Sequence, residues 1–325
     1  MSLNPDLQQM LEENSRAKGP ALQNMPIEEA RAALRDSFIK RGYPLEHPAD
    51  IEHFEISTDS ANFSIDIYRP INSRDTALPV LLYFHGGGFV LGDAQAYDRQ
   101  SRALAYLLKV AVVFVNYRLA PEHRYPAATN DAREVVNWLA KHGKDNNLNV
   151  QKIIACGESA GGNLAVHAAL HSSSVNTGKD NKLNIIATTL IYPVTDLRPF
   201  YQPNMHYPSM QSYANGYNLD IAELNWFWQQ YLEREEQAEL ADNSLILHPQ
   251  LQHLPNTQIF VAQCDPLRDL GIAFAMKLQE LDVNTSIDCL PGMLHSFMFH
   301  GGVCGDALRH FYKVIEKIDA QFHSC

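Results

Sequence analysis

The chain has 325 residues, of which 46% are hydrophobic, and its formal net charge at pH 7 is −11. This hydrophobic content is ordinary for a globular protein and is sufficient for a large buried core. The excess of acidic residues argues against nucleic acid or an anionic membrane surface as a main partner, because both would repel the protein.

The segment 1–18 is polar and lacks the hydrophobic run of a secretory signal. The longest apolar runs, such as Val110 to Val115, are too short to span a bilayer, so we expect no stable membrane anchor. The five cysteines have no C-x-x-C spacing, which argues against a disulfide framework and favours a reducing compartment. The sequence therefore predicts a cytoplasmic protein.

Residues 1–45 are predicted to contain two helices, from Pro5 to Arg16 and from Ile27 to Arg41. In the second helix, apolar residues recur at spacings of three and four from Ile27 to Phe38, which is the pattern of an amphipathic helix. Because both helices precede any strand, we expect them to pack over the main sheet as an N-terminal cap.

The strands that follow change in character along the chain. Glu52 to Ser57 and Asn62 to Arg69 alternate apolar and polar residues, which is typical of a half-exposed antiparallel hairpin. Later strands are continuously apolar, which indicates that both faces are covered by helices. These strands are Val80–Phe84, Ala111–Asn116, Ile153–Cys156, Ile185–Tyr192, Gln258–Ala262 and Thr285–Leu290.

Helical patterns lie between these strands and after the last of them. They cover Arg99–Leu108, Ala132–His142, Ala160–His171, Leu270–Leu281 and Ala307–Phe322. This alternation predicts an α/β fold with a mostly parallel, doubly wound sheet and helices on both faces.

Residues 196–243 interrupt the alternation, because this segment is too long for a simple connection and is rich in aromatic residues. A helix is predicted from Asp220 to Arg234. An insertion at the carboxyl end of strands commonly forms a lid, so we expect a cap here, with an extra packing element as the alternative. The Trp226-Phe227-Trp228 cluster either shapes a pocket or fastens this lid. The core would then comprise 46–195 and 244–325.

A G-x-S-x-G pentapeptide, Gly157-Glu158-Ser159-Ala160-Gly161, lies between a predicted strand and a predicted helix. This is the setting of a nucleophile elbow, a tight turn that holds the serine hydroxyl clear of its own backbone. Glycine at positions 157 and 161 avoids the clash between the strand and the departing helix. Ser159 is therefore the predicted nucleophile.

A serine hydroxyl needs a base to remove its proton and an acid to orient that base. In α/β folds that carry such an elbow, the acid and the histidine follow the serine along the chain, each after a later strand. Asp265 and His295 occupy those places and are the predicted acid and base. Asp269 competes as the acid but would suit a helix N-cap, and His300 competes as the base but lies further from its strand.

The motif His85-Gly86-Gly87-Gly88-Phe89 directly follows a strand. Glycines let backbone amides face the oxygen on which acyl transfer builds negative charge. Gly87 and Gly88 are the predicted donors together with Ala160, and Gly86 is a further candidate. His85 is expected to hold the loop by hydrogen bonding. A phosphate-binding loop is the rival interpretation, but neither G-x-x-x-x-G-K-[ST] nor G-x-G-x-x-G is present.

Five motifs together resemble the hormone-sensitive-lipase-like carboxylesterases. They are HGGGF at 85–89, YRLAPEHRYPAA at 117–128, GESAGG at 157–162, DPLRD at 265–269 and HSF at 295–297. The resemblance covers about Leu78 to Phe299 and implies the α/β-hydrolase fold with a helical cap. It also implies a catalytic triad of Ser159, Asp265 and His295, with an oxyanion hole made by Gly87, Gly88 and Ala160.

The same resemblance implies buried ion pairs among Arg118, Glu122 and Asp131 near the site. Family members usually carry Asp or Thr where this chain has Glu158. We interpret Glu158 as a supporting residue behind the nucleophile, whose longer reach shifts the loops of the acid and the base slightly.

The predicted function is hydrolysis of short- to medium-chain carboxylic esters through an acyl-enzyme intermediate, with no metal or organic cofactor. One alternative is an amidase or deacetylase acting on small acyl amides. Another is a non-catalytic small-molecule receptor, such as the plant gibberellin receptors, which lose the catalytic histidine that His295 supplies here. A homodimer is also an expectation, because related folds pair edge strands.

His167 and His171 stand four residues apart on a predicted helix, which is the spacing of a metal-binding pair. The residue after His167 is alanine rather than glutamate, and no third ligand is evident from the sequence. A structural role is therefore expected for both histidines.

Overall fold

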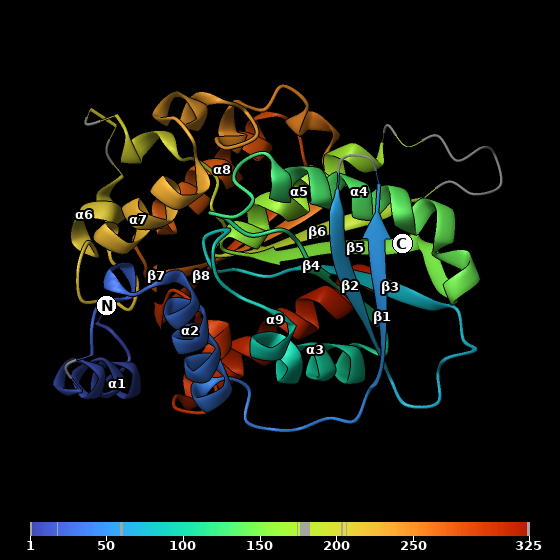
Figure 1. The fold of residues 1–325 in the computed structure, drawn as a ribbon, viewed down its shortest axis with the longest axis horizontal. Helices are drawn as coiled ribbons and strands as arrows, with labels where there is room; N and C mark the ends of the chain where they lie inside the picture. Colours follow the sequence, from blue (N-terminus) through green and yellow to red (C-terminus); the bar gives the residue numbers. More distant parts are fainter. Residues whose placement is uncertain are drawn as a thin grey trace.

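The computed structural model describes residues 2–17, 19–58, 61–173, 175, 183–202, 204–205 and 207–323. An eight-stranded sheet with the order β1-β2-β4-β3-β5-β6-β7-β8 crosses its centre (Figure 1). The strands are β1 (Asp50–Ser57), β2 (Asn62–Arg69), β3 (Leu78–Phe84), β4 (Ala111–Asn116), β5 (Leu148–Glu158), β6 (Ile185–Ile191), β7 (Asn256–Cys264) and β8 (Thr285–Leu294). Strand β2 runs antiparallel to both neighbours, and β3 to β8 are mutually parallel, as predicted.

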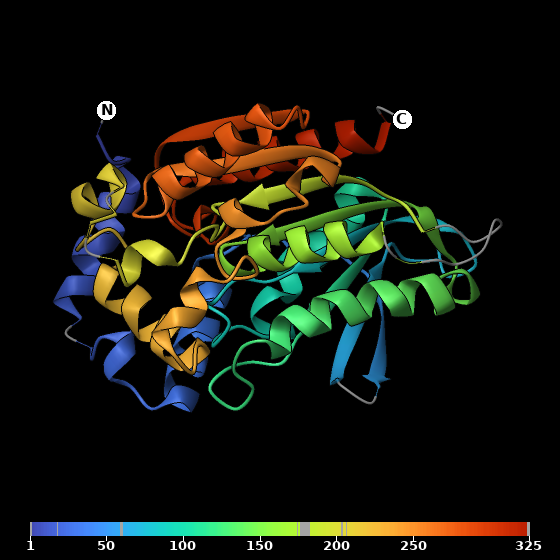
Figure 2. The ribbon, with the colours of Figure 1, turned by 90° about the horizontal axis from the view of Figure 1, so that it is seen from above.

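Helices cover both faces of this sheet. The longer ones are α1 (Pro5–Arg16), α2 (Ile27–Arg41), α3 (Ala94–Leu108), α4 (Ala127–His142), α5 (Ala160–Ser172), α7 (Ile221–Tyr231), α8 (Arg268–Glu280) and α9 (Gly305–His323). Helices α3 and α9 lie on one face, and α4, α5 and α8 lie on the other (Figure 1). In Figure 2 the green helices α4 and α5 cross in front of the sheet. The predicted doubly wound α/β architecture is confirmed.

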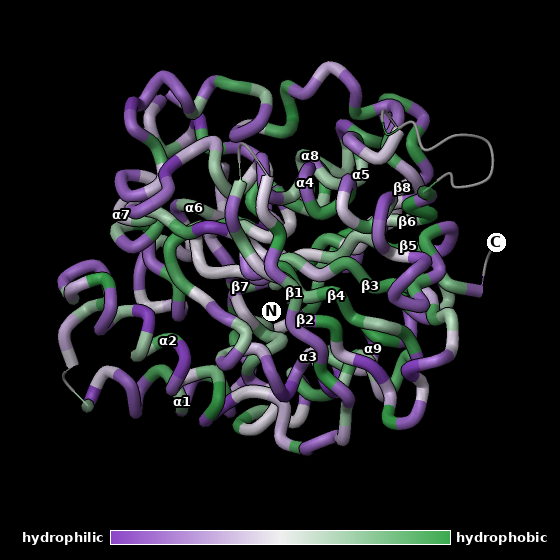
Figure 3. The backbone as a smooth tube through the Cα atoms, turned by 45° about the vertical axis from the view of Figure 1, so that its right-hand side comes forward, coloured by the Kyte–Doolittle hydropathy of each residue, from purple (hydrophilic) through white to green (hydrophobic). Residues whose placement is uncertain are grey.

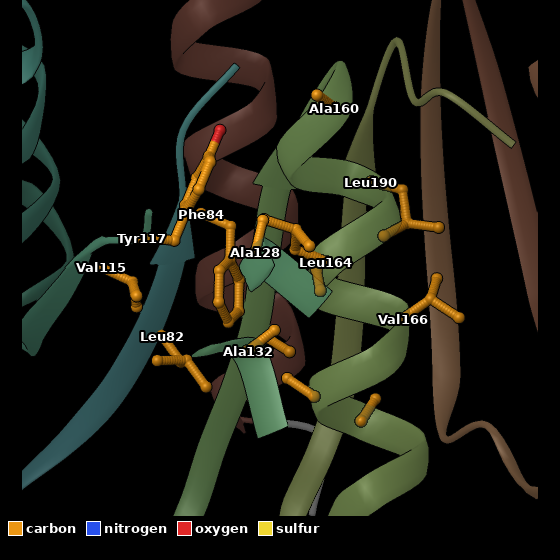
Figure 4. Packing of buried hydrophobic residues seen from close by; sticks show 14 of the residues in the cluster. Leu82, Phe84, Val115, Tyr117, Ala128, Ala132, Ala160, Leu164, Val166 and Leu190 are labelled. Atoms are coloured by element: carbon orange, nitrogen blue, oxygen red, sulfur yellow. The ribbon is translucent and has the colours of Figure 1, made fainter. Parts of the chain in front are cut away.

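The continuously apolar strands follow from this layering, because successive side chains of a strand point to opposite faces. On β3, Leu82 and Phe84 join one buried cluster, while Leu81 and Tyr83 join the other. Figure 4 shows Leu82 and Phe84 packed near Ala132 of α4. In Figure 3 the hydrophobic stretches of the chain gather along the inner strands, and hydrophilic stretches lie on outer helices and loops.

Several predicted boundaries were wrong: α3 begins at Ala94, α4 begins at Ala127 and β8 ends at Leu294, and two further differences concern β5 and α7. Strand β5 extends well beyond the predicted Ile153–Cys156, because its first half includes polar residues that break the apolar pattern. Helix α7 ends at Tyr231, since Leu232 already has extended backbone angles of φ −90° and ψ 141°. The extension of β5 brings Glu158 to the end of a central strand.

Two segments lie over the end of the sheet at which the parallel strands finish: α2, and the segment that carries α6 (Pro208–Ser212) and α7 (Figure 1). Phe38 of α2 stacks on Phe299 with ring centroids 3.8 Å apart. Arg124 donates hydrogen bonds to the carbonyls of Gln229 and Leu232 at 2.9 and 2.6 Å. These contacts fix both segments to the body of the protein.

The ion pairs that the family resemblance implied are formed in part. Arg118 pairs with the buried Asp131 at 2.7 Å. Glu122 instead pairs with Arg31 of α2 at 2.7 Å, and half of its side chain is exposed. The expectation of a buried pair at Glu122 was therefore wrong, because its partner comes from the N-terminal helices.

Among the helices of the described ranges, none combines the length and the hydropathy that a membrane-spanning helix requires.

Candidate active site

The turn at Ser159 joins the end of β5 directly to the start of α5. Ser159 has φ 53° and ψ −121°, an unusual conformation for a residue with a side chain. A β-carbon at Gly157 would lie 2.0 Å from the carbonyl oxygen of Gly161, and one at Gly161 would lie 2.1 Å from that of Phe84. Both positions therefore exclude a side chain, which is the physical reason for glycine that the sequence suggested.

The structure brings Ser159, His295 and Asp265 together although they are far apart in the chain. Asp265 directly follows β7, and His295 directly follows β8. His295 Nε2 lies 3.1 Å from Ser159 Oγ, and His295 Nδ1 lies 2.8 Å from Asp265 Oδ2. The other carboxylate oxygen of Asp265 accepts a hydrogen bond from the amide of Leu267 at 2.8 Å. All three side chains are buried, so the relay is largely shielded from water.

The two competing residues lie outside this relay. Asp269 accepts a hydrogen bond from the amide of Ser209 at 2.7 Å and pairs with Arg268 at 2.7 Å. It is not the N-cap of α8, because the helix begins at Arg268 and Leu267 caps it. His300 is buried, and this burial lowers its pKa to about 3.

Two contacts position His295. The ring of Tyr192 packs against the imidazole with centroids 4.6 Å apart. The side-chain amide of Asn218, from the segment before α7, donates to the His295 carbonyl at 3.3 Å. Neither residue stood out in the sequence, because their contacts with His295 join segments that lie far apart in the chain.

Backbone amides of the glycine loop face the site. Gly87 and Gly88 have φ values of 109° and 63°, which residues with side chains rarely adopt. In the described parts of the chain, neither amide has a hydrogen-bond acceptor. The amide of Gly86 differs, since it donates to the Tyr97 hydroxyl at 3.0 Å. Ala160 is the first residue of α5, where an amide has no intrahelical acceptor.

His85 is buried beneath this loop. Its Nδ1 lies 2.7 Å from the carbonyl oxygen of Gly86, and its ring stacks on Tyr117 with centroids 4.2 Å apart. The Tyr117 hydroxyl donates to the His85 carbonyl at 2.8 Å. Burial lowers the pKa of His85 to about 4, so the ring is neutral at pH 7. These contacts hold the loop in place.

Glu158 lies behind the nucleophile with its carboxyl group fully buried. Burial raises its pKa to about 7, although hydrogen bonds from the hydroxyls of Tyr192 and Tyr83 partly oppose this rise. Because Tyr192 also packs on His295, Glu158 is connected to the predicted base through one side chain. Glu158 also lines the cavity beside Ser159, where the hydroxyls of the two tyrosines bind its carboxyl group.

Replacing Glu158 with glutamine is expected to change how stability depends on pH. The folded-state pKa of about 7 lies above the ordinary value of 4.5, so the buried carboxyl stabilises the fold fully only below about pH 4.5. The free energy of unfolding therefore falls by roughly 3 kcal/mol as pH rises from about 4.5 to about 7. Urea unfolding of both proteins at pH 5 and pH 8 measures the difference.

When pH rises from 5 to 8, the free energy of unfolding should fall less in Glu158→Gln than in the unmodified protein. Glu233→Gln, at an exposed glutamate, is the matched control and should behave as the unmodified protein does. If Glu158→Gln and the unmodified protein differ in free energy of unfolding by the same amount at both pH values, the carboxyl group of Glu158 does not titrate as described.

Ser159 and His295 open on a cavity of about 210 Å³. Phe227 and Trp228 of α7 and Leu34 of α2 give it apolar walls. A β-carbon at Gly88 would lie 2.3 Å from the ring of Phe227, so this wall sits directly against the glycine loop. Trp226, whose ring packs on Phe227 with centroids 5.1 Å apart, is not among the lining residues.

A group of possible metal ligands lies where the end of the 196–243 segment meets α5. The ligand atoms of His167, Asp242 and His248 lie within 4.8 Å of one another. His167 Nε2 is 2.9 Å from the Asp242 carbonyl oxygen, and Arg133 pairs with the Asp242 carboxylate at 2.9 Å. The positive charge of Arg133 disfavours a cation there. The same contacts anchor the end of the 196–243 segment to α4 and α5.

This arrangement corrects part of the sequence interpretation. His171 does not join His167, since its Nε2 contacts Asn137 Oδ1 at 3.0 Å. Asp242 and His248 approach His167 instead, and neither was evident from the sequence. Neither residue could be found from spacing, since both lie more than 70 residues away along the chain.

Comparison with known proteins adds independent evidence. A family model described as the alpha/beta hydrolase fold matches residues 81–299. An ethyl acetate hydrolase from Pseudomonas putida is 32% identical over 325 residues, which are 98% of this chain and 99% of that protein. An arylesterase from Saccharolobus solfataricus is 29% identical over 92% of this chain and 93% of its own.

Solved structures agree with these relatives. An ester hydrolase from the metagenome of Lake Arreo, complexed with a bipyridine phosphonate derivative, has a TM-score of 0.87 and 26% identity over 99% of this chain and 100% of its own. A thermostable esterase from Pseudomonas putida has a TM-score of 0.85 and 27% identity over 99% of this chain and 96% of its own. The chain therefore belongs to the alpha/beta hydrolase fold family, within its hormone-sensitive-lipase-like carboxylesterases.

Proposed function

We propose that this protein hydrolyses carboxylic esters with short to medium acyl chains through an acyl-enzyme intermediate. The observation that carries the proposal is the hydrogen-bonded relay from Ser159 through His295 to Asp265, which opens on a cavity beside unpaired amides of the described glycine loop. The names of relatives, an ethyl acetate hydrolase and an arylesterase, point to the same reaction class.

In the proposed first step, His295 Nε2 takes the proton of Ser159 while Oγ attacks the ester carbonyl carbon. The amides of Gly87, Gly88 and Ala160 donate to the resulting oxyanion, where such donors are worth most because water is excluded. The Gly86 amide has a partner in Tyr97 and is the weakest candidate of the loop. Collapse of the intermediate breaks the ester C–O bond, and His295 gives its proton to the leaving alcohol.

The second step regenerates the enzyme. Water replaces the alcohol. His295 takes one proton from this water, and the resulting hydroxide attacks the acyl carbon. The carboxylic acid leaves as the bond to Ser159 Oγ breaks and that oxygen recovers a proton from His295. Throughout, Asp265 holds the imidazole with its proton on Nδ1 and stabilises the imidazolium that forms in each half-reaction.

We also propose that residues 1–45 and 196–243 act as the cap over a core made of 46–195 and 244–325. Support comes from the cavity walls, to which α2 contributes Leu34 and α7 contributes Phe227 and Trp228. A volume of about 210 Å³ with apolar walls suits a short or medium acyl chain.

A panel of 4-nitrophenyl esters with acyl chains of two to twelve carbons tests the proposal, with matched 4-nitroanilides to measure amide cleavage. We expect kcat/KM to be highest for the shorter esters and to fall for the longest, and each ester to exceed its anilide. Faster cleavage of anilides would favour the amidase alternative. Saturable binding of these compounds without turnover would favour the receptor alternative.

Two further expectations belong to this proposal. A cytoplasmic location is supported by free thiols at Cys156, Cys264, Cys289 and Cys304. A homodimer is supported by the position of β8, which forms one edge of the sheet and can pair with a second copy. Light scattering in solution gives the mass that decides between monomer and dimer.

A further inference from the structure

The catalytic cavity has polar residues that the proposed reaction does not use. Ser37 and Arg41 of α2 line it together with His300, which follows the short helix Phe297–Phe299. Ser37 and Arg41 are one helical turn apart, and Arg41 donates a hydrogen bond to the Ser37 hydroxyl. The guanidinium also acts on His300, since its charge helps to lower the pKa of that histidine.

Arg41 is a charged residue of α2 that lines this cavity. Within the described ranges it takes part in no ion pair, and its side chain contacts Ser37 Oγ and, at 3.2 Å, Met10 Sδ. Burial lowers its pKa, and no neighbouring anion opposes this effect. Withdrawing a guanidinium from water is unfavourable unless an anion or several hydrogen-bond acceptors compensate.

The other arginines of α2 show the usual arrangement. Arg31 pairs with Glu28 and Glu122 at 2.8 and 2.7 Å, and Arg35 pairs with Asp93 at 2.5 Å. Arg41 is the arginine of this helix that lines the catalytic cavity, and among the described residues it is the one that forms no ion pair. The missing partner is therefore expected from a ligand in that cavity.

His300 supplies the second, independent observation. Only 2% of its surface is exposed, and its Nδ1 is buried without a hydrogen-bond partner among the described residues. An unpartnered buried nitrogen is unfavourable, and most such groups in folded proteins are paired. His300 lines the same cavity, and a small turn of its neutral ring, with the proton on Nδ1, would let it donate one hydrogen bond to an oxygen atom there.

We propose that Arg41, Ser37 and His300 form a subsite for a carboxylate group carried by the ester substrate. Half-esters of dicarboxylic acids, or esters of hydroxy acids, are then the preferred substrates. A carboxylate offers two acceptor oxygens and a single negative charge to this guanidinium. This inference rests on the proposed esterase function, and the hydrolysis itself proceeds by the same two steps.

Two substrate pairs test the subsite and show which side of the ester carries the charge. Monoethyl glutarate is compared with ethyl pentanoate for an acyl-side carboxylate, and 4-acetoxybutanoate with butyl acetate for an alcohol-side one. We expect kcat/KM of the protein to favour the charged member of at least one pair by about tenfold, as expected for a charge-assisted hydrogen bond. No preference in either pair would overturn the proposal.

Three variants assign the preference to Arg41. Arg41→Gln should reduce it about tenfold, and Arg41→Lys, which keeps the charge, should retain more of it. Lys40→Gln is the matched control, because Lys40 is exposed and does not line the catalytic cavity. If Lys40→Gln lowers the preference as much as Arg41→Gln, the effect is one of net charge and the subsite is rejected.

A binding measurement separates this inference from the proposed function. Monoethyl glutarate is titrated calorimetrically into Ser159→Ala and into Ser159→Ala/Arg41→Gln, with thermal unfolding to check that both are folded. The subsite predicts an affinity about tenfold weaker for the double variant. Equal affinities reject the subsite. If the unmodified protein hydrolyses no ester but the affinities differ, the proposed function fails and the subsite stands.

Discussion

Replacing Ser159 with alanine is expected to lower kcat for ester hydrolysis by a factor on the order of 10⁴ or more. The substitution removes the oxygen that His295 Nε2 approaches at 3.1 Å, so the acyl-enzyme cannot form. Alanine is smaller than serine and introduces no new contact, so the elbow should remain folded. Initial rates with 4-nitrophenyl butyrate, extended to long reaction times, measure the loss.

Ser172→Ala is the matched control for this prediction. Ser172 ends the same helix that begins beside Ser159, and its hydroxyl bonds to the carbonyl of Ala169 at 2.7 Å, outside the cavity. We expect this variant to retain activity within about twofold of the unmodified protein, because Ser172 is only half-buried and does not line the cavity. Retention of activity by Ser159→Ala would show that another group is the nucleophile.

Asp265→Asn is expected to lower kcat by a factor of about 10³ to 10⁴. The carboxylate accepts a hydrogen bond from His295 Nδ1 at 2.8 Å and so leaves Nε2 free to accept the serine proton. An asparagine that presents its NH₂ group favours the opposite tautomer, in which Nε2 already carries a proton. Activity should therefore fall while the folded structure, followed by circular dichroism, is kept.

Asp269→Asn provides the comparison, since Asp269 is the acid that competes for this role in the sequence. It contacts the amide of Ser209 and the side chain of Arg268, and neither contact reaches His295. A loss of no more than about tenfold is expected. The assignment is wrong if Asp269→Asn is the more damaging of the two substitutions.

The catalytic geometry could be predicted because its signals are local. Gly157 and Gly161 mark a turn whose backbone leaves no room for a β-carbon, and that requirement is visible in five consecutive residues. Asp265 and His295 each follow the end of a strand, and the ends of parallel strands meet at one edge of a sheet. The positions of the two residues at strand ends, together with their order along the chain, therefore predict that their side chains approach the serine.

The supporting residues could not be predicted, because they act across long sequence separations. Tyr192 contacts both Glu158 and His295, but nothing in the residues around it distinguishes it from other tyrosines at strand ends. Glu122 pairs with Arg31, 91 residues away. The same limitation applies to the N-terminal helices, whose amphipathic pattern indicates burial but does not show that α2 lines the catalytic cavity.

The wrong expectation at Asp269 has a different physical origin. An aspartate just before an apolar helical pattern resembles an N-cap, but α8 begins earlier, at Arg268. The carboxylate instead receives the amide of Ser209 from the 196–243 segment. Tertiary contacts with this segment therefore outweigh the local capping preference.

The most direct test of the central claim is covalent labelling with an uncharged fluorophosphonate, followed by intact-mass measurement and peptide mapping. In the proposed mechanism, Ser159 is nucleophilic because His295 and Asp265 activate it. We predict one adduct per chain, on the peptide that contains Ser159, and strongly slowed labelling in Asp265→Asn. An active protein that takes up no label, or takes it up at a residue other than Ser159, would contradict the account.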